Sequence, residues 1–451
     1  MLYLTLKKIF CCVNLCLATL AALFVLASPG HAQTFTVIHS FSGADGAFPQ
    51  AGLSIDARGR LYGSTSSGGQ SGFDCQEQGC GTVFRLTSQG DGWTLTPLWK
   101  FRGPDDGAIP ISRPVFGPNG LLYGTTNAGG AQFCEGPGCG AAYSLHPGAT
   151  ACTTALCPWQ ENIMYSFGGV EAICNGITSG MGPRPPHQPG FLILGSCPGL
   201  GELTFDQAGN LYGTIPCCYG AVYQLTASGV ATPLYFFGGG ADGEGPEAGV
   251  IFDHAGNLYG TTVSGGTAGG GTVYELSPNG SGWTKTTLYS LQGGSEGSAP
   301  YGGLIFDNAG NLYGTTNLGG ANNGGTVFEL TPSGGGSWSF HLLYSLPYHG
   351  TADWLLYGPT ASLVMDSSGN LYGTTVLDGD FGDGNVFKLT PSGGGWTYTS
   401  LHDFHGTADG GQVFGSVVLD ANGNLYGTAT VGGAGDGCPG FGCGVIWEIT
   451  P

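Results

Sequence analysis

One phrase recurs along this chain and limits the folds that the chain can adopt. A Leu-Tyr-Gly triplet followed by Thr or Ser occurs seven times, at steps of 61, 89, 47, 54, 59 and 54 residues. Its tyrosines are Tyr62, Tyr123, Tyr212, Tyr259, Tyr313, Tyr372 and Tyr426. A motif that returns at this spacing indicates an array in which one small structural unit is built several times.

Each unit begins with two short apolar runs on either side of a turn. The first runs are GLSID (52–56), RPVFG (113–117), ELTFD (202–206), GVIFD (249–253), GLIFD (303–307), SLVMD (362–366) and SVVLD (416–420). The turn is usually Asp-x-x-Gly-Asn, in which the aspartate can accept backbone N–H groups and the glycine tolerates left-handed geometry. The second run is LYGTT or a variant of it.

Two more runs complete the unit. The third runs are GTVFRL (81–86), GAAYSL (140–145), GAVYQL (220–225), GTVYEL (271–276), GTVFEL (325–330), GNVFKL (384–389) and GVIWEI (444–449). The fourth often opens with tryptophan, as in WTLTPLWKF (93–101), WTKTTLYSL (283–291), WSFHLLYSL (338–346) and WTYTSLHDF (396–404). Short β-branched and aromatic runs bounded by Gly, Pro, Asn and Ser are typical of strands, so each unit predicts four strands.

The ends of the chain settle how many units close together. The seventh unit stops at Pro451, after its third strand, while FTVIHSF (35–41) at the other end matches the fourth-strand pattern. We therefore predict an all-β, seven-bladed β-propeller whose last blade is completed by the N-terminal strand, which pairs with 444–450. Closing the ring removes a sheet edge that would otherwise be exposed. An open solenoid is the alternative, and it does not explain the divided unit.

The predicted blades are numbered in chain order. They cover about 52–101, 113–167, 202–237, 249–291, 303–346, 362–404, and 416–450 together with 34–41. A Gly- and Pro-rich insertion at 168–201 precedes blade 3. Such an irregular segment on a rigid scaffold is either a place where function concentrates or a tolerated surface insertion.

The first 32 residues have the pattern of a secretory signal peptide. Lys7 and Lys8 precede an apolar stretch, and Gly30 and Ala32 are small residues suited to cleavage before Gln33. A retained membrane anchor is the alternative. We expect a secreted, periplasmic or cell-surface protein with no membrane span in the mature chain, because no other apolar run is long enough to cross a bilayer.

The charge balance excludes some partners. The chain has 11 basic and 30 acidic residues, and the two lysines of the signal leave on cleavage, so the mature net charge is about −21. Nucleic acids and anionic membrane surfaces bind basic patches, so we expect neither as a partner. The negative charge can serve simply to keep the protein soluble, or it can favour binding of a cation or a basic ligand. We expect a monomer.

An acidic loop precedes the first strand at six blade junctions. Its carboxylates are Asp45, Asp105, Asp106, Asp242, Glu244, Glu296, Asp353 and Asp409. We expect these loops on the face that also carries the loops between second and third strands, where a ring of carboxylates could bind a ligand or hold Ca²⁺. The alternative is that Asp-Gly simply forms a good turn. No other cofactor is expected.

Twelve cysteines remain after the signal, and an even number in an exported chain predicts disulfides. The pairs Cys75/Cys80, Cys134/Cys139 and Cys438/Cys443 fall between second and third strands, and Cys152/Cys157 between the third and fourth strands of blade 2. The other four, with three possible pairings, are Cys174, Cys197, Cys217 and Cys218. Zinc binding is the alternative, although no histidines are paired with these cysteines. A redox Cys-x-x-Cys motif is absent.

The phrases GNLYGTT, GGTVFELTP and W-T-x-T-x-LYSF resemble the tandem repeat of GloVer-containing bacterial exported proteins, over nearly all of 34–451. The resemblance implies an exported propeller and no established activity or catalytic residues. Members of that family often end in a C-terminal sorting or anchoring tail, whereas this chain stops at its last strand, so the resemblance leaves surface anchoring open.

No catalytic signature stands out, and neither G-x-S-x-G nor a P-loop occurs. We therefore expect a module at or beyond the bacterial cell envelope that binds a protein or carbohydrate and is not an enzyme. The alternative is an extracellular glycan-active enzyme, a hydrolase or lyase, that uses loop carboxylates. A purely structural surface protein is the third interpretation.

Overall fold

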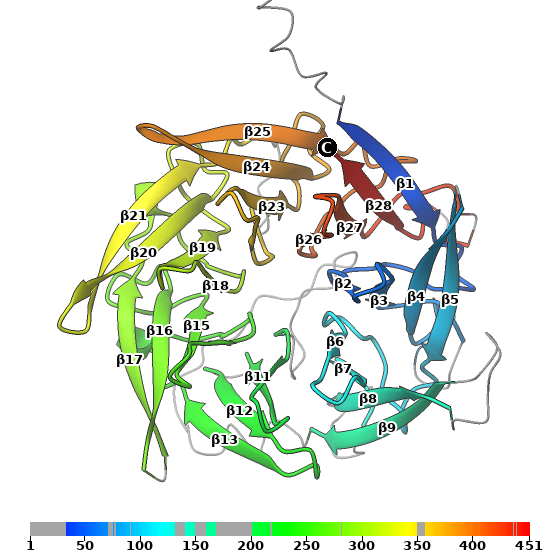
Figure 1. Cartoon of the computed structure of the whole chain (residues 1–451), viewed down its shortest axis with the longest axis horizontal. Coiled ribbons are helices and arrows are strands. Elements are labelled where there is room, and N and C mark those ends of the chain that lie inside the picture. The colour runs from blue at the N-terminus through cyan, green and yellow to red at the C-terminus, as the bar shows by residue number, and fades with distance from the viewer. Residues whose placement is uncertain are drawn as a thin grey trace, which may run out of the picture.

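The structure is a ring of seven small β-sheets (Figure 1). The computed structural model describes residues 33–70, 75, 78–90, 92–130, 140–148, 159–167, 201–216, 219–280, 282–349, 357–435, 437–438 and 440–451. These residues include no α-helix, and none of their helical turns is long and apolar enough to cross a membrane. Each sheet has four antiparallel strands, so the predicted seven-bladed propeller is confirmed.

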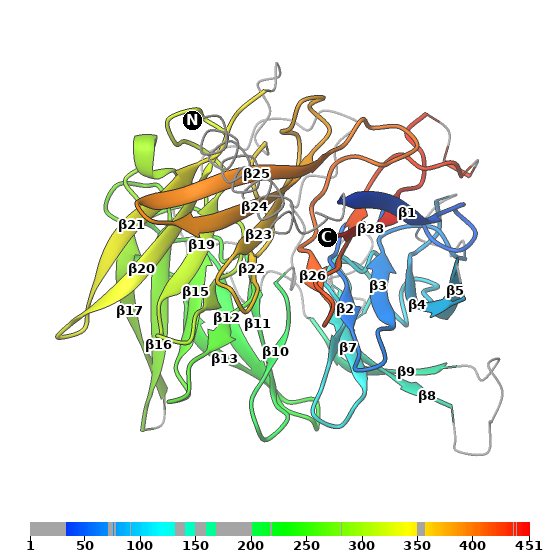
Figure 2. The ribbon, with the colours of Figure 1, turned by 45° about the horizontal axis from the view of Figure 1, so that its top comes forward.

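Within each blade the strands pair in repeat order, from the centre of the ring to its rim (Figures 1 and 2). Blades 1 to 3 are β2 (Ser54–Ile55), β3 (Leu61–Thr65), β4 (Thr82–Gln89) and β5 (Gly92–Lys100); β6 (Val115–Phe116), β7 (Leu122–Thr125), β8 (Ala141–Pro147) and β9 (Trp159–Ser166); β10 (Thr204–Phe205), β11 (Leu211–Ile215), β12 (Ala221–Leu225) and β13 (Ala231–Phe236). Blades 4 and 5 are β14 (Ile251–Phe252), β15 (Leu258–Thr262), β16 (Thr272–Asn279) and β17 (Gly282–Ser290); β18 (Ile305–Phe306), β19 (Leu312–Thr316), β20 (Thr326–Gly334) and β21 (Ser337–Ser345). Blades 6 and 7 are β22 (Val364–Met365), β23 (Leu371–Thr375), β24 (Asn385–Ser392) and β25 (Gly395–Asp403); β26 (Val418–Leu419), β27 (Leu425–Ala429), β28 (Val445–Thr450) and the N-terminal β1 (Thr34–Ser40).

Two details of the strands and junctions differ from what the sequence repeat predicts. The innermost strands pair with the second strands over only two residues, as at Ser54 and Ile55, and Gly52 just before them lies against Ser416 of blade 7. Two short 3₁₀ turns, η2 (Gly240–Asp242) and η3 (Gly294–Glu296), lie in the junctions that lead into blades 4 and 5. The sheet order itself follows the repeat in every blade.

The ring closes as the divided seventh unit predicts. β1 pairs antiparallel with β28, from Thr34 opposite Thr450 to Ser40 opposite Val445. The ring of Phe35 stacks on His402 of blade 6, with centroids 3.6 Å apart, and meets the edge of Phe404. Strand β1 therefore completes blade 7 and also packs against blade 6.

The glycine of the Leu-Tyr-Gly triplet makes room for an aromatic ring. Gly63 pairs opposite Phe84 in the neighbouring strand, and a Cβ on Gly63 would lie 2.5 Å from Cζ of that ring. The same pairing occurs in all seven blades, with Trp447 over Gly427 in blade 7. This close approach requires a residue without a side chain, which explains the repeated glycine.

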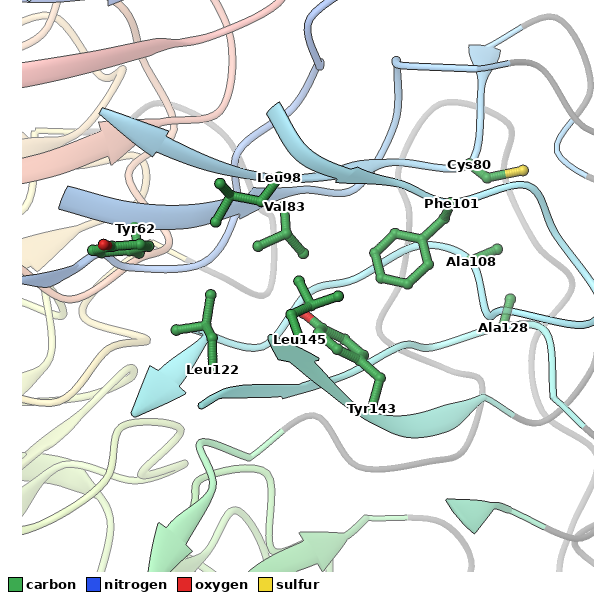
Figure 3. Close-up of a cluster of buried hydrophobic side chains, with 10 residues drawn as sticks. All are labelled: Tyr62, Cys80, Val83, Leu98, Phe101, Ala108, Leu122, Ala128, Tyr143 and Leu145. Atoms are coloured by element: carbon green, nitrogen blue, oxygen red, sulfur yellow. The ribbon is translucent and has the colours of Figure 1, made fainter. Parts of the chain in front are cut away.

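The tyrosine of the triplet joins one blade to the next. Tyr62 meets Phe116 of blade 2 edge to face at 4.9 Å, and Tyr259 meets Phe306 of blade 5 in the same way. Figure 3 shows one such inter-blade core, in which Tyr62 and Val83 of blade 1 face Leu122 and Leu145 of blade 2. The repeat therefore encodes the contact between neighbouring blades.

The Asp-x-x-Gly-Asn turn is held by one carboxylate. In blade 5, Asp307 accepts hydrogen bonds from the backbone N–H groups of Ala309 and Asn311, from the Asn311 amide and from the Tyr313 hydroxyl, at 2.8 to 3.2 Å. Burial alone would raise the pKa of Asp307, but these hydrogen bonds lower it below its ordinary value. Blade 2 has Gly117 here, and Asn119 makes the turn contacts instead.

We expect Asp307→Ala to reduce the free energy of unfolding by about 2 kcal/mol at pH 7, because four donors lose one acceptor. Since the pKa of Asp307 is lowered in the folded state, this contribution is present above pH 3.8 and is lost as the pH falls through the folded pKa. Urea unfolding at pH 7 and pH 3 measures both effects. Asp307→Asn, which keeps one acceptor oxygen, should lose less; equal stability of D307A and wild type at pH 7 would contradict the prediction.

Candidate ligand site in the central channel

The loops that join one blade to the next cross one face of the ring and are anchored there. They form antiparallel bridges with the loops between second and third strands, for example Ala108 with Ala128 and Ser298 with Leu318. The two kinds of loop therefore share a face, as expected for a propeller. This anchoring fixes the direction in which each junction enters the centre of the ring.

A residue with positive φ sits at the same place in four junctions. The four are Phe48, Ile109, Ala299 and Gln412, with φ between 55° and 57°. The N–H of Ile109 donates to the Cys80 carbonyl, and its own carbonyl accepts from Asn127 N–H, both at 2.9 Å. Side chains with a Cβ rarely adopt this conformation, so the hydrogen bonds on both sides hold it in place. The following residues are thus positioned by the backbone before any ligand arrives.

The residues two positions after these four line one cavity, and so do those two positions after Gly245 and Gly358, which hold the equivalent place in two other junctions. The cavity has a volume of about 110 Å³ and is called the mouth here, and the six residues are Gln50, Ile111, Glu247, Tyr301, Thr360 and Phe414. Each comes from a different blade, and no two are alike. The flanking positions are nearly uniform, with proline before five of the six and Gly, Ala or Ser after all of them.

A second ring of residues forms a neck between the mouth and a deeper cavity of about 370 Å³. Both cavities are lined by Arg113, Glu202, Gly249, Gly303, Ser362 and Ser416. The Arg113 guanidinium lies 2.6 Å from the Glu202 carboxylate, which also accepts a hydrogen bond from Ser416 at 3.1 Å. Since Ser416 belongs to blade 7 and Glu202 to blade 3, the Glu202 side chain reaches across the ring.

Glycines in the neck and beside it let the inner strands approach one another. A Cβ on Gly249 would lie 2.1 Å from the Glu202 carbonyl oxygen, and one on Gly52 would lie 2.6 Å from that of Ser416. Below the neck, the deeper cavity is lined by residues of the innermost strands β10, β14, β18 and β22, including Ile251, Ile305 and Val364. The channel therefore has a polar neck and a partly apolar interior.

Glu247 is the unusual acid of the mouth. Burial raises its pKa to about 7, and its Oε2 atom is enclosed without a hydrogen-bond partner in the part of the chain that the structure describes. Burial also raises the pKa of Tyr301, and the nearby charge of Glu247 raises it further. A carboxylate that is shut away from water without a partner is unfavourable, so this group gains from a partner that enters the mouth.

The repeat matches one known family over most of its length. The model of the Gloeobacter/Verrucomicrobia repeat matches residues 22–178 and 198–441. The chain belongs to the Gloeobacter/Verrucomicrobia repeat family. The resemblance seen in its repeated phrases is thereby confirmed. Curated protein sequences give no match to this member of the family.

Solved structures give distant likenesses to this Gloeobacter/Verrucomicrobia repeat protein. A gluconolactonase from Xanthomonas campestris is 16% identical over 55% of this chain and 71% of its own, with a TM-score of 0.36. A candidate 6-phosphogluconolactonase from Bacteroides uniformis is 12% identical over 84% and 90%, with a TM-score of 0.46. A protein of unknown function from Dyadobacter fermentans is 11% identical over 93% and 98%, with a TM-score of 0.44. Likenesses this distant say nothing about activity.

The acidic residues predicted at the junctions of this repeat protein lie outside both cavities wherever the structure describes them. Asp242, Glu296 and Asp409 each accept the backbone N–H of the residue four positions earlier and a hydrogen bond from an aromatic side chain of the preceding strand. Asp45 and Asp106 accept similar backbone bonds, Glu244 accepts from Ser264, and Asp105 is exposed. Asp353 lies outside the described residues.

These contacts give the junction acids a local role in the turn. Within the described residues, no three His, Cys, Asp or Glu side chains are placed to hold a metal ion together. Binding of a ligand or of Ca²⁺ by the junction acids stays a prediction, which the structure does not test.

Two of the predicted disulfides are present. Cys75–Cys80 and Cys438–Cys443 close loops between second and third strands in blades 1 and 7. The Cys443 carbonyl accepts the N–H of Phe48, and the Cys80 carbonyl accepts that of Ile109, so both bridges brace the strained junctions beside the mouth. The other predicted cysteines lie outside the described residues: Cys134, Cys139, Cys152, Cys157, Cys174, Cys197, Cys217 and Cys218.

The residues of the mouth and neck were not among those predicted from the sequence. A signal for them exists in the sequence. When the six junctions are aligned on the proline that five of them share, the next position differs in each of the six while its neighbours repeat. Arg113 and Glu202 likewise replace the glycine that opens the first strand in blades 1, 4 and 5. Departures from a repeat at equivalent positions point to the site better than a feature that every blade shares.

Proposed function

We propose that this Gloeobacter/Verrucomicrobia repeat protein is exported and acts as a binding module, taking a small ligand at the mouth of its central channel. The observation that carries the proposal is the ring of six different side chains on a backbone that is otherwise repeated. A structural filler would repeat from blade to blade, as the glycine and tyrosine of the triplet do. Differing polar and aromatic groups around one cavity are typical of a ligand site.

The framework around the mouth supports this function. The positive-φ residues are held by hydrogen bonds on both sides, and two disulfides brace the loops that hold them. A site that is rigid before binding loses little conformational freedom when the ligand arrives. Export is supported by the N-terminal signal pattern and by the disulfides, which persist in oxidising compartments.

We expect at least one class of small molecule to raise the melting temperature of the purified protein. The panel contains monosaccharides, amino acids, small amines and small carboxylates. A ligand at a hundred times its Kd stabilises the folded state by about 2.7 kcal/mol, enough for a clear shift.

Phe414→Ala removes a mouth side chain and should abolish the shift. The matched control Phe381→Ala removes an exposed phenylalanine outside both cavities and should keep it. No shift with any class, or an unchanged shift in F414A, would contradict a ligand site at the mouth. Hydrolysis of a chromogenic glycoside that disappears in F414A would instead favour an enzyme.

A further inference from the structure

Glu247 differs from the other described acids of the junctions in lining the mouth, because those acids lie outside both cavities. Glu244, three residues earlier, accepts a hydrogen bond from Ser264 at 3.0 Å and lies outside the cavities. The Glu247 Oε2 atom is enclosed at the mouth and has no hydrogen-bond partner within the described part of the chain. A buried carboxylate without a partner is costly, and an incoming donor or cation would relieve that cost.

The charges that line the channel leave one carboxylate unbalanced. Arg113, Glu202 and Glu247 are the only charged residues along the described walls of the two cavities. Arg113 is neutralised by Glu202 at 2.6 Å, so an ionised Glu247 leaves a net charge of −1. The formal net charge of the whole chain is −19, which also attracts cations. The electrostatic complement of this channel is therefore a single positive charge.

The walls beside Glu247 suit an organic cation better than a hydrated metal ion. Tyr301 and Phe414 border the same cavity, and aromatic faces attract ammonium groups. A metal ion would require several oxygen ligands, yet among the described residues Glu247 is the only carboxylate at the mouth besides the paired Glu202. The volume of about 110 Å³ and the Glu202 side chain across the neck limit the ligand to a compact molecule.

We propose that the mouth binds a compact organic monocation, such as a primary ammonium group, which forms an ion pair with Glu247. This inference rests on the proposed function and names its ligand class. Binding transfers the proton of a neutral Glu247 to solvent and leaves a carboxylate beside the ammonium. Among the described residues, the other titratable or charged groups that line the mouth are Tyr301, Arg113 and Glu202, and Arg113 and Glu202 remain paired throughout.

The probe is isobutylammonium chloride, and isobutanol is its neutral counterpart of similar shape. Isothermal titration should show ammonium binding at pH 8 and at least tenfold weaker binding of isobutanol. Since Glu247 titrates near pH 7 and the ammonium stays charged, affinity should fall roughly thirtyfold between pH 8 and pH 5.5. Titrations in two buffers of different ionisation enthalpy should also detect proton release near pH 6.5.

Glu247→Gln should weaken ammonium binding at pH 8 at least tenfold and remove the pH dependence. The matched control Glu244→Gln should change neither. Equal binding of isobutanol and isobutylammonium, or wild-type affinity in E247Q, would overturn the inference. If a neutral ligand binds in a Phe414-dependent way and ammonium does not, this inference fails while the proposed function stands. If no panel compound binds, both fail.

Discussion

Deleting residues 33–41 is expected to prevent the chain from forming its native ring. The deletion removes strand β1, which is the fourth strand of blade 7. Without β1, strand β28 becomes an open edge of the sheet. Phe35 and Val37 pack into the core between blades 6 and 7, while Ile38 and the fully buried Phe41 pack into the core between blades 7 and 1. We expect a loss of more than about 5 kcal/mol, since losing one buried aromatic side chain alone costs about 3–5 kcal/mol.

The melting temperature and the hydrodynamic radius of the deleted chain measure this effect. The expected result is an unfolded or aggregated product, because an uncovered edge strand pairs with other chains. A synthetic peptide of residues 33–41 should restore a compact monomer by occupying the edge of β28. A deleted chain that melts within a few degrees of wild type would contradict the role given to β1.

A single substitution tests the same point in a chain that still folds. Phe35→Ala should lower the free energy of unfolding by about 3 kcal/mol, because it removes the ring stacked on His402 and leaves a cavity beside Phe404. The control Thr36→Ala changes an exposed residue of the same strand and should have an effect below about 0.5 kcal/mol. Equal losses in the two variants would argue against packing as the cause.

Much of this architecture could be predicted from the sequence because the repeat encodes contacts between neighbours. The glycine under each aromatic ring, the tyrosine against the next blade and the turn aspartate of six blades recur because every blade presents the same faces. The divided seventh unit identified β1 as the partner of β28 for the same reason. These contacts are local or join adjacent blades, so the pattern of residue types is enough to find them.

The channel could not be predicted in this way. Its mouth is formed by single positions more than forty residues apart in sequence, for example Gln50, Ile111 and Glu247, and none carries a motif. The pairing of Glu202 with Arg113 and Ser416 depends on the curvature of the closed ring, which no local pattern records. Conversely, the acidic junctions were conspicuous in sequence because the turn repeats. Except for the exposed Asp105, each described junction acid has a hydrogen-bond partner within the loops or the preceding strand.

Strand register also places the carboxylate of Glu161 in an unfavourable position, which residue spacing alone does not reveal. The equivalent residue of blade 4 shows the favourable arrangement. Lys285 of β17 pairs opposite Leu276, and its buried ammonium lies 2.9 Å from Asp242 in the junction before blade 4. Glu161 of β9 occupies the equivalent position opposite Leu145, and the equivalent junction acid is Asp106. Blade 2 therefore places a carboxylate where blade 4 places a cation.

The pKa shifts of the acids in blades 2 and 4 agree with this difference in charge. Burial and then the charge of Asp106 raise the pKa of Glu161 to about 9, and its Oε1 atom has no hydrogen-bond partner in the described part of the chain. Burial also raises the pKa of Asp106, despite hydrogen bonds from Arg102 and Gly103. By contrast, backbone hydrogen bonding and Lys285 bring the pKa of Asp242 below its ordinary value despite burial.

We expect Glu161→Gln and Glu161→Lys to stabilise the protein at alkaline pH. Because the pKa of Glu161 is higher in the folded state, about 9 against 4.5, wild-type stability is full below pH 4.5 and falls as the pH rises towards 9. At pH 8 the loss relieved by E161Q is about 3 kcal/mol, from about 1.4 kcal/mol for each pKa unit and partial screening. E161K should gain slightly more, because its ammonium can pair with Asp106 as Lys285 pairs with Asp242.

Urea unfolding of wild type and both variants from pH 5 to pH 9 tests this expectation, and the reciprocal change provides its control. Lys285→Glu places a second carboxylate beside Asp242 and should destabilise blade 4 by about 3–5 kcal/mol at pH 8, because it removes one partner of a buried ion pair. The advantage of E161Q should grow steadily with pH, whereas an effect of side-chain shape would be constant. A constant difference, or a wild type that is more stable than E161Q at pH 8, would show that Glu161 has a partner that compensates its charge.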